Sequence, residues 1–379
     1  MPSKMTTVAG QPSWRLANAE VELFVTRTGG HLAPVTFARG GAAIRPYAVA
    51  PWAEEDLPPD TPPIIRSLRG DFFCMPFGGN DEVWEGEDHQ VHGATANLDW
   101  ELVTHTADEL HLRMESNVRP AVVDKRISLR PGHNAIYSQH QVSGGTGPIP
   151  IGHHACLKFP DVEGSGRLSS SRKIHRQVFV DPAEAPATGG YSCLQPGAII
   201  DDLSACPTVF GTTADLTQFP LRRGFEDIFI QCDDPTLPFA WNAVSYPDLG
   251  YVWLSIKDPR VLSSTLYWWS NGGRHYAPWN GRHRNVLGME EITAYFHYGL
   301  ARSAAPNSLR EQGIPTTVEL DPNEPLVVNY IMAACPTPAG FGRVTDIQQR
   351  DAETVTLVDE NGTEVEMALA LGFLTEGGK

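Results

Sequence analysis

Leu110-His111-Leu112-Arg113-Met114-Glu115 is the run that decides the fold class of this chain, because apolar and polar side chains alternate along it. A period of two places one face of an extended chain in a core and the other in water, so we predict a β-strand. Farther along, Ile127 and Leu129 lead into the turn-forming stretch Pro131-Gly132-His133-Asn134, and Ala135-Ile136-Tyr137 follows it. This order predicts a pair of strands joined by a turn.

A second strand pair is predicted near the C-terminus. The alternating apolar positions of Val355–Leu357 and Val365–Leu369 flank Asn361-Gly362, a dipeptide that can take the positive φ angles of a tight hairpin. Helical periodicity is sparse, and its best example is Asn307–Gln312, a short helix ended by Gly313. Helices are therefore expected to be few and short.

The composition also favours an all-β protein. Of the 379 residues, 35 are Gly and 31 are Pro, and both types interrupt helices but form the corners between strands. The chain has no fixed-period repeat of the kind that marks propellers and solenoids. We therefore expect a large antiparallel β-sandwich with few short helices.

The sandwich is predicted to occupy residues 1–300. A soft boundary lies at Ala301–Pro306, and several strand-like runs follow it, such as Leu326–Ala334. Residues 301–379 are expected to form a β-rich extension that packs on the sandwich as an appendage or continues it.

Charge and hydropathy exclude several classes of partner. The 29 Lys and Arg against 45 Asp and Glu give a net charge of −16, and the resulting field repels phosphate backbones and anionic membranes. No window approaches the roughly 18 to 20 apolar residues of a membrane helix, and the opening MPSKMTTVAGQPSW lacks the apolar stretch of a signal peptide. We expect a cytoplasmic protein without a nucleic acid or membrane partner.

Neither a disulfide framework nor a metal site is predicted. His89 and His92 are three residues apart, but His153 and His154 are adjacent, and adjacent side chains of a strand point to opposite faces, so the latter two cannot serve one ion. The six cysteines have no CxxC spacing and are expected to be buried free thiols: Cys74, Cys156, Cys193, Cys206, Cys232 and Cys335.

Four clusters carry side chains that can exchange protons near neutral pH. Histidine and carboxylate are the groups suited to this task, and apposing one of each supplies an acid and a base. The clusters are Glu85–Gly93, Gly152–His154, Glu226-Asp227 and Glu290-Glu291. They are far apart in the sequence, so only a fold that brings distant strands together can assemble them into one site.

Three loops also stand out. Ala53–Pro63 is acidic and proline-rich, Val180–Pro196 carries proline, glycine and serine, and either could flank a binding groove. The third, Asn271–Asn285, is either a solvated loop or a place for an anionic group. It holds Trp279 among Arg274, His275, Arg282, His283 and Arg284.

The order of these features resembles the aldose 1-epimerase (galactose mutarotase) superfamily, over about residues 14 to 300. Residues 14–32 are similar to the first strands of that superfamily and their Gly-Gly turn, Gly29-Gly30. Three later stretches are similar to its signatures: PFGGNDEVWEGEDHQVHG (76–93) before Trp100-Glu101-Leu102, GHHACLKFP (152–160) and LGMEEITAY (287–295). The resemblance implies the galactose mutarotase-like supersandwich.

The resemblance also implies roles for individual residues. Glu290 is the expected general base, His154 the general acid, and His92 a residue that holds or polarises the sugar. Glu226 falls where the superfamily often has an aspartate that binds sugar hydroxyls, although Asp227 beside it is an alternative match. Taking the anomeric proton and returning one to the ring oxygen requires no metal or other cofactor.

Three departures from the superfamily pattern concern the substrate more than the fold. Asn80-Asp81 replaces the frequent Asn-Arg, so the sugar-binding arginine is missing there, and Arg69 or Arg66 is a conceivable substitute. The aromatic residues expected after the second histidine are replaced by Cys156-Leu157, and the proline after the base by Glu291. Ring faces for stacking on a sugar are offered by tryptophans, of which core packing would take at least two: Trp268, Trp269 and Trp279.

These observations together predict an aldose 1-epimerase that interconverts sugar anomers by acid–base ring opening, with a small sugar as its partner. The first alternative is an epimerase of a phosphorylated or acidic sugar, in which arginines of residues 274–284 hold the anion. The second is a non-catalytic carbohydrate-binding or regulatory protein on the same fold. A third, a lyase or hydrolase, needs a carboxylate pair or an acid tyrosine, for which the sequence offers no clear signal.

Overall fold

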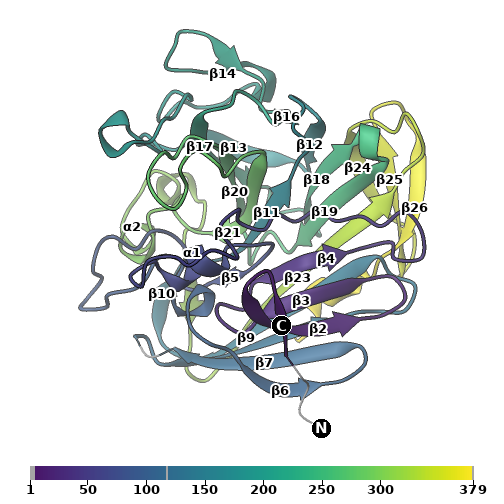
Figure 1. Cartoon of the computed structure of the whole chain (residues 1–379), viewed down its shortest axis with the longest axis horizontal. Coiled ribbons are helices and arrows are strands. Elements are labelled where there is room, and N and C mark those ends of the chain that lie inside the picture. Colours follow the sequence, from purple (N-terminus) through teal and green to yellow (C-terminus); the bar gives the residue numbers. More distant parts are fainter. Residues whose placement is uncertain (1–4, 117, 378–379) are drawn as a thin grey trace.

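The computed structural model describes residues 5–116 and 118–377, and most of its regular structure is antiparallel β-sheet (Figure 1). The largest sheet has nine strands. In order across this sheet they are β16 (Gln218–Phe219), β12 (Gly166–Ser170), β18 (Ala240–Tyr246), β19 (Tyr251–Lys257), β23 (Leu326–Pro336), β9 (Ala135–Gly144), β8 (Ala121–Ser128), β7 (Glu109–Ser116) and β6 (Glu101–His105).

A six-stranded sheet forms the second large layer. Its order is β13 (Lys173–Val178), β17 (Phe225–Asp233), β20 (Ser264–Asn271), β21 (Val286–Thr293), β11 (Ile151–Lys158) and β5 (Phe73–Cys74). The smaller sheets are β1–β4 (Thr6–Val8, Gln11–Ala17, Glu22–Thr26, Leu32–Thr36), β24–β26 (Val344–Gln349, Thr354–Asp359, Glu364–Ala368), β10 with β22 (Gly147–Ile149, Val318–Leu320) and β14 with β15 (Cys206–Pro207, Thr213–Ala214).

Helices are short throughout the described residues. The two α-helices are α1 (Pro63–Ser67) and α2 (Leu300–Ala304). Single 3₁₀ turns lie at Ala94–Ala96, Pro186–Thr188, Leu203–Ala205, Pro247–Leu249, Arg310–Gln312 and Leu371–Thr375. No helix in the part of the chain that the structure describes has the length and apolar character needed to cross a membrane.

The two large sheets pack face to face. Trp253 and Tyr330 of the nine-stranded sheet share one buried apolar cluster with Leu157 and Met289 of the six-stranded sheet, and all four are at most 1% exposed. Burial of such side chains is the main source of stability, at about 1.5–3 kcal/mol for each large apolar side chain. The arrangement confirms the predicted β-sandwich.

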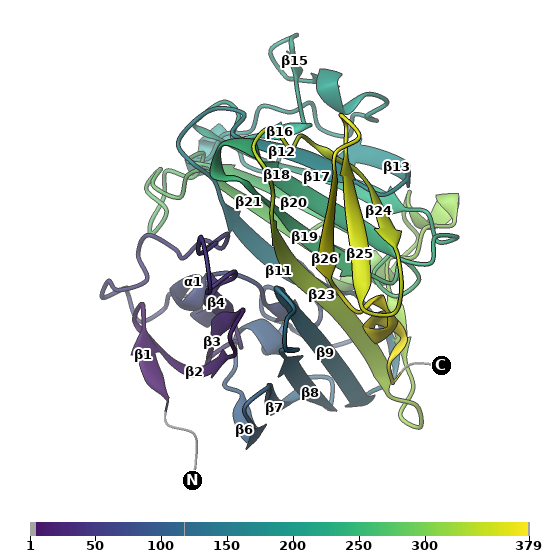
Figure 2. The same cartoon turned by 90° about the vertical axis from the view of Figure 1, so that its right-hand side faces the viewer.

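Each large sheet is covered on its outer face as well. Strands β24–β26 lie over the nine-stranded sheet, where Val355 and Leu357 pack with Leu254 and Ile331 (Figure 2). The outer face of the six-stranded sheet is covered by loops and α1, through a third cluster that includes Phe72 and Trp268. This second covering layer encloses the candidate site.

The predicted strand pairs are present. The run Leu110–Glu115 lies in β7, and residues 129–134 connect β8 to β9, which pair antiparallel. The polar residue His111 is nevertheless buried in β7, because its Nε2 pairs with Asp124 at 2.5 Å. The C-terminal hairpin is formed by β25 and β26, and Gly362 supplies the positive φ, +78°.

The helix predicted at Asn307–Gln312 is shorter than expected. Only Arg310–Gln312 is helical, as a 3₁₀ turn, and the side-chain oxygen of Asn307 accepts the N–H of Arg310 at the start of the turn. Gly313 ends it with φ +77°, as predicted.

The strand-like run at Leu326–Ala334 lies in β23, between β19 and β9 in the nine-stranded sheet. All six cysteines are buried free thiols, as expected.

Candidate active site

The outer face of the six-stranded sheet forms the floor of a cavity of about 340 Å³. His154 of β11 is the register partner of Glu290 of β21, and Trp268 of β20 pairs with Gly288, two residues before Glu290. Because side chains two apart on a strand share a face, these three point to the same side of the sheet. The volume lies within the range of about 300–1,000 Å³ that is usual for small-molecule sites.

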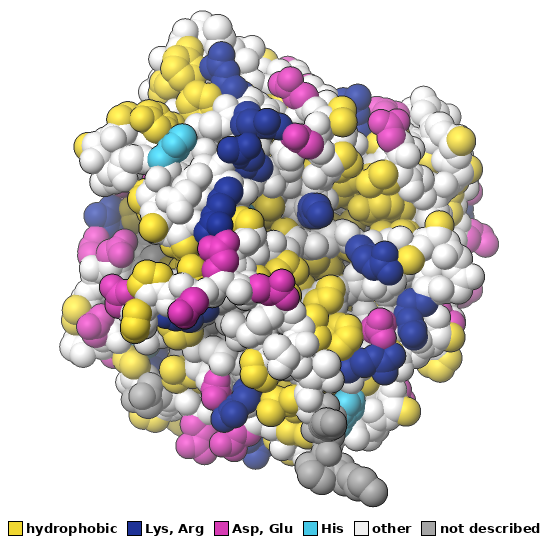
Figure 3. Space-filling model, viewed as in Figure 1, with side chains coloured by type: hydrophobic (Ala, Val, Ile, Leu, Met, Phe, Trp, Pro, Cys, Tyr) yellow, Lys and Arg dark blue, Asp and Glu magenta, His cyan; other side chains and the backbone are white. Residues whose placement is uncertain are grey.

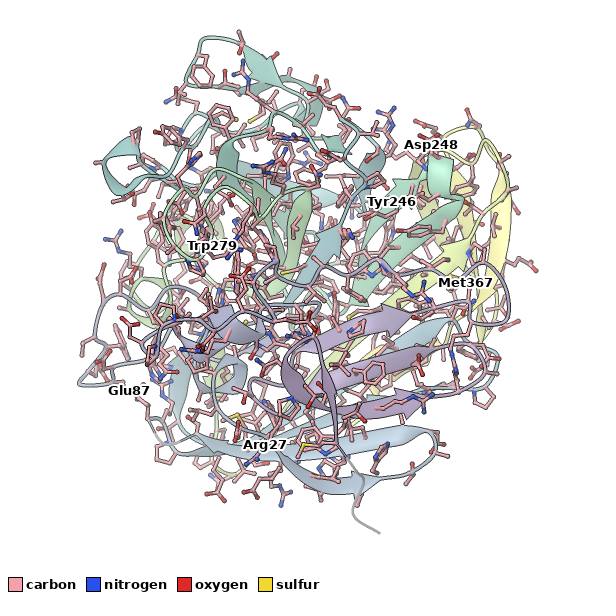
Figure 4. All side chains as sticks on the ribbon, in the orientation of Figure 1. Arg27, Glu87, Tyr246, Asp248, Trp279 and Met367 are labelled. Atoms are coloured by element: carbon pink, nitrogen blue, oxygen red, sulfur yellow. The ribbon has the colours of Figure 1, made fainter. Side chains whose placement is uncertain are left out.

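Loops from four parts of the chain build the walls. One wall is the stretch Pro62–Leu68 around α1, and another is the loop between β20 and β21, which carries Trp279 (labelled in Figure 4). His92 lies on the loop that follows β5, and His297 comes shortly after β21. On the face of the molecule seen in Figure 3, acidic and basic side chains are intermingled.

His154 and Glu290 are in direct contact at the floor. Nε2 of His154 lies 3.2 Å from Oε1 of Glu290, and Phe72 stacks on the imidazole with ring centroids 4.5 Å apart. The second carboxyl oxygen, Oε2 of Glu290, is buried and has no hydrogen-bond partner among the described residues. A buried polar atom without a partner is costly, so this oxygen is available to a ligand group.

Burial sets the proton affinity of this pair. It raises the pKa of Glu290 well above the ordinary carboxylate value, an effect that the positive charge of Arg274 partly offsets. It lowers the pKa of His154 well below the ordinary imidazole value, and His297 lowers it further. Both directions favour a pair that holds one proton in total near neutral pH, because the pair is then uncharged overall.

His92 forms a second contact pair with a histidine that the sequence analysis did not select. Nε2 of His92 lies 3.2 Å from Nε2 of His297. The His92 ring also meets His154 edge to face, with centroids 5.1 Å apart. His92, His154 and Glu290, from three separate sequence clusters, therefore line one cavity.

Arg274 is the one cationic side chain that lines the described cavity. Its Nε donates to Glu184 at 2.6 Å, and the Tyr276 hydroxyl donates to the same carboxylate oxygen at 3.0 Å. The guanidinium lies 5.1 Å from the ring centroid of Trp268 and 4.5 Å from that of Trp279. Glu184 belongs to the long loop at residues 180–196, which thus flanks the cavity by holding Arg274.

The adjacent residues Glu226 and Asp227 lie on opposite faces of β17. Glu226 is on the cavity side of the sheet but does not line the cavity, because its carboxyl group accepts from Trp268 Nε1 at 2.9 Å, from Ser270 and from the Gly273 N–H. Burial raises its pKa to about 7. Asp227 accepts the N–H groups of Cys193 and Leu194 and borders a different cavity, with Trp269.

Arg69 and Trp269 do not line the cavity, whereas Trp268, Trp279 and Arg274 do. The buried guanidinium of Arg69 donates to the backbone oxygens of Ser67, Val8 and Ala9, outside the cavity. Trp268 and Trp279 line the cavity, at 6% and 5% exposure, whereas Trp269 does not. Of the arginines in the basic loop, only Arg274 reaches the cavity: Arg282 pairs with Glu55, and Arg284 donates to the Gly281 oxygen.

The two adjacent histidines point to opposite faces of β11, as predicted. His154 faces the cavity, and His153 faces the interior, where it contacts Asp71 at 2.9 Å. His89 is bound to Glu87 at 2.8 Å. Over residues 5–116 and 118–377, no three His, Cys, Asp or Glu side chains are grouped as metal ligands.

Phe72, Tyr276 and His297 line the cavity but were not selected from the sequence. Their signals are local and weak, because an aromatic side chain in a run of apolar residues is usually core. Phe72 lies one residue before β5, and the register of β5 with β11 places it against His154. The alternation of β21 does not extend to His297, since that residue follows the strand end at Thr293.

Comparison with solved structures identifies the fold. No family model and no curated protein matches the chain. Among solved structures, it is similar to an Escherichia coli K12 protein provisionally named an aldose 1-epimerase, with 14% identity, a TM-score of 0.60 and coverage of 86% of this chain and 100% of the other. A galactose mutarotase related enzyme of Lactobacillus acidophilus is also similar, at 14% identity, TM-score 0.56 and coverage of 86% and 98%.

A third solved structure, a galactose mutarotase-like protein of Lactobacillus casei, shares 11% identity over 85% of this chain and 100% of its own, with a TM-score of 0.57. The chain therefore has the galactose mutarotase-like all-β fold, as the resemblance in sequence implied. At such low identity the likeness establishes the architecture alone.

Proposed function

We propose that the protein is an aldose 1-epimerase, which interconverts the α and β anomers of an aldose. The observation that carries this proposal is the His154–Glu290 pair: an acid and a base in contact at the floor of a sugar-sized cavity, with Oε2 of Glu290 left without a partner. Anomer exchange needs one proton removed and one supplied at neighbouring oxygens of the sugar.

The reaction follows from the proton that the pair shares. Before a sugar binds, burial favours the proton on Glu290, so this proton must first pass to His154 across the contact between Oε1 and Nε2, which leaves Glu290 a carboxylate. Glu290 takes the proton of the anomeric hydroxyl while His154 gives its proton to the ring oxygen, so the bond between the anomeric carbon and the ring oxygen breaks and an aldehyde forms. After rotation of the aldehyde, the ring oxygen attacks its other face and both protons return. Each positioned group contributes about 10²–10⁴ in rate.

The other cavity residues hold the sugar in this scheme. The ring faces of Trp268 and Trp279 offer apolar surface for the C–H groups of a pyranose. His92 and Arg274 offer N–H donors to its oxygens. Arg69 and Asp227 lie outside the cavity, so we leave them out of the proposed substrate contacts.

A second candidate function is the exchange of anomers of an acidic or phosphorylated sugar. The observation in its favour is Arg274, whose terminal guanidinium nitrogens have no hydrogen-bond partner among the described residues while Nε is held by Glu184. Arginine binds carboxylate and phosphate through such a free edge. The carboxylate of Glu184 already balances its charge, and for that reason we place the neutral sugar first.

The test is polarimetric measurement of anomer exchange over a panel of neutral and acidic aldoses, with sugar affinity measured in parallel by calorimetry. Glu290→Gln keeps the shape of the side chain but removes the base, so exchange should fall by about 10² or more while affinity changes little. The exposed Glu101→Gln is the matched control and should leave both unchanged. Sugar binding without exchange in the unmodified protein would instead identify a carbohydrate-binding protein.

A further inference from the structure

His92 and His297 form a pair with a defined direction of hydrogen bonding. The N–H of Gly78 donates to Nδ1 of His92 at 3.4 Å, so the ring proton of neutral His92 is on Nε2. That Nε2 lies 3.2 Å from Nε2 of His297, which must therefore accept. One imidazole thus presents a donor and the other an acceptor at the same point of the cavity wall.

The backbone on both sides of the pair is held in an unusual conformation. His92 has φ +57°, and Phe296, immediately before His297, has φ +47° although its bulky side chain is fully buried. Such angles are disfavoured for residues other than glycine and persist only where the surroundings impose them, most often at functional sites.

The Asn80 side chain links the two segments that carry His92 and His297. Its side-chain nitrogen donates to the oxygens of Gly78 and of Gln90, two residues before His92, and its oxygen accepts the N–H of Leu300, three residues after His297. The N–H of Gly79 also donates to the backbone oxygen of His297, at 2.6 Å. The turn at 78–80 thus fixes both imidazoles relative to each other.

Both rings are uncharged near neutral pH. Burial, with a smaller contribution from the positive charge of Arg274, lowers the pKa of His297 to about 4. Burial also lowers the pKa of His92 well below the imidazole value, with His297 and His154 adding to the effect. The pair can therefore act as one neutral donor and one neutral acceptor.

We propose that His92 and His297 together recognise a single hydroxyl group of the substrate, and that His297 is a specificity-determining residue. This inference rests on the proposed function, because it takes the ligand to be a sugar. A hydroxyl that enters the contact accepts from Nε2–H of His92 and donates to Nε2 of His297, so one hydrogen bond is exchanged for two.

Other groups cannot satisfy both rings. A carboxylate, a carbonyl or a fluorine can accept from His92 but has no proton to donate to Nε2 of His297. A deoxy position offers neither function and leaves the two rings bonded only to each other, so neither kind of group gains the second hydrogen bond. Sites built to bind a hydroxyl reject the analogue that lacks it far more strongly than apolar pockets reject a change in size. The pair therefore predicts that discrimination is concentrated at one hydroxyl position of the sugar.

The experiment measures the affinity of D-galactose, D-glucose and their monodeoxy and monofluoro analogues for the unmodified protein, His297→Ala, His297→Asn and the control His175→Ala. His175 lies on β13 and pairs with Gln177, away from the cavity. In the unmodified protein and the control, replacing the hydroxyl at one sugar position by hydrogen or by fluorine should weaken binding by about tenfold or more. In His297→Ala this loss of affinity should shrink to about threefold or less, and in His297→Asn, which keeps an acceptor, part of the loss should return.

Several outcomes overturn the inference. Equal discrimination in His297→Ala and the unmodified protein would do so, as would the absence of any position at which the fluoro and deoxy analogues both fail. Nitrogen-15 NMR of the unmodified protein adds a readout that needs no variant: finding the His92 proton on Nδ1 would also reject the pair. Binding with the expected discrimination but without anomer exchange would reject the proposed function alone, and failure of all these sugars to bind would reject both.

Discussion

Glu290 and His154 are register partners on neighbouring strands, and Oε1 of the glutamate lies 3.2 Å from Nε2 of the histidine at the floor of the cavity. Antiparallel pairing of β21 with β11 fixes this contact, because residues directly opposite each other carry their side chains on the same face of the sheet. An acid and a base are thus positioned by the backbone of the sheet, and loops supply the residues around them.

The first prediction concerns the pH dependence of anomer exchange. The active state holds one proton on the pair. Burial lowers the pKa of His154 and raises that of Glu290, so a second proton should add only below the ordinary imidazole pKa of about 6.5, and the last should leave only above the ordinary carboxylate pKa of about 4.5. The acid limb of the rate profile should therefore lie below about 6.5, and the alkaline limb should be shifted upward by the burial of Glu290. An acid limb centred at or above about 6.5, in polarimetric rates corrected for the uncatalysed reaction, would contradict this.

The second prediction tests how closely the floor is packed. A β-carbon added at Gly288 would lie 2.8 Å from Oε1 of Glu290 and 3.0 Å from Cβ of Trp268. Gly288→Ala should therefore displace the carboxyl group and lower anomer exchange by about 10², since small misplacements of a catalytic group have effects of this size. Gly41→Ala, at a position with no atom within 4 Å, is the control. Unchanged exchange in Gly288→Ala would argue against Glu290 as the base.

The sequence predicts the fold and the residues of the cavity floor, but not the residues of its walls. The alternation in β7 and the hairpin at β25–β26 follow from side-chain period and turn chemistry, which are local properties. His154 and Glu290 could be predicted because the order of motifs in the sequence resembles that of the superfamily. The opposite orientation of Glu226 and Asp227 also follows from strand alternation, but which of them faces the cavity depends on how β17 packs.

The walls depend on contacts between distant segments, which no local pattern encodes. Arg274 is one of several arginines in the basic loop. It differs from Arg282 and Arg284 in its ion pair with Glu184, which lies 90 residues away in the sequence. His297 lies beyond the end of β21, and its backbone oxygen accepts the N–H of Gly79, more than 200 residues earlier in the chain. Arg69, expected as a substitute for the missing sugar-binding arginine, instead binds backbone oxygens near the N-terminus.

The third prediction separates neutral from acidic substrates. Arg274→Ala removes the cation of the cavity wall and leaves the carboxylate of Glu184 with the Tyr276 hydroxyl alone, so we expect weaker binding of every sugar, by about tenfold. If the protein's own substrate is a neutral sugar, calorimetric titrations should show a similar loss of affinity in Arg274→Ala for neutral and acidic sugars. Arg284→Ala is the matched control, because that side chain lies outside the cavity. A loss confined to acidic sugars would favour the second candidate function.

The last prediction contrasts two adjacent glutamates of β21. Glu291 faces the interior between the sheets, where it is 0% exposed and accepts from Ser255, Asn242 and Thr265 and pairs with Lys257. Burial opposes the charge of this carboxylate, but Lys257 and Lys173 hold its pKa below the ordinary value. Glu291→Gln leaves Lys257 with less compensation, and breaking a buried ion pair in this way costs about 3–5 kcal/mol.

Glu290→Gln should have the opposite profile. Among the described residues its carboxyl group has one polar contact, to His154, and burial already favours its uncharged form, so an amide of the same shape should change the free energy of unfolding by less than about 1 kcal/mol. Urea denaturation of the two variants, with anomer exchange measured on each while folded, checks both effects. Glu291→Gln should lower stability and retain exchange at temperatures where it is folded, and Glu290→Gln should retain stability and lose exchange. Equal loss of stability in both would show that Glu290 is part of the buried framework and not a group held ready for a ligand.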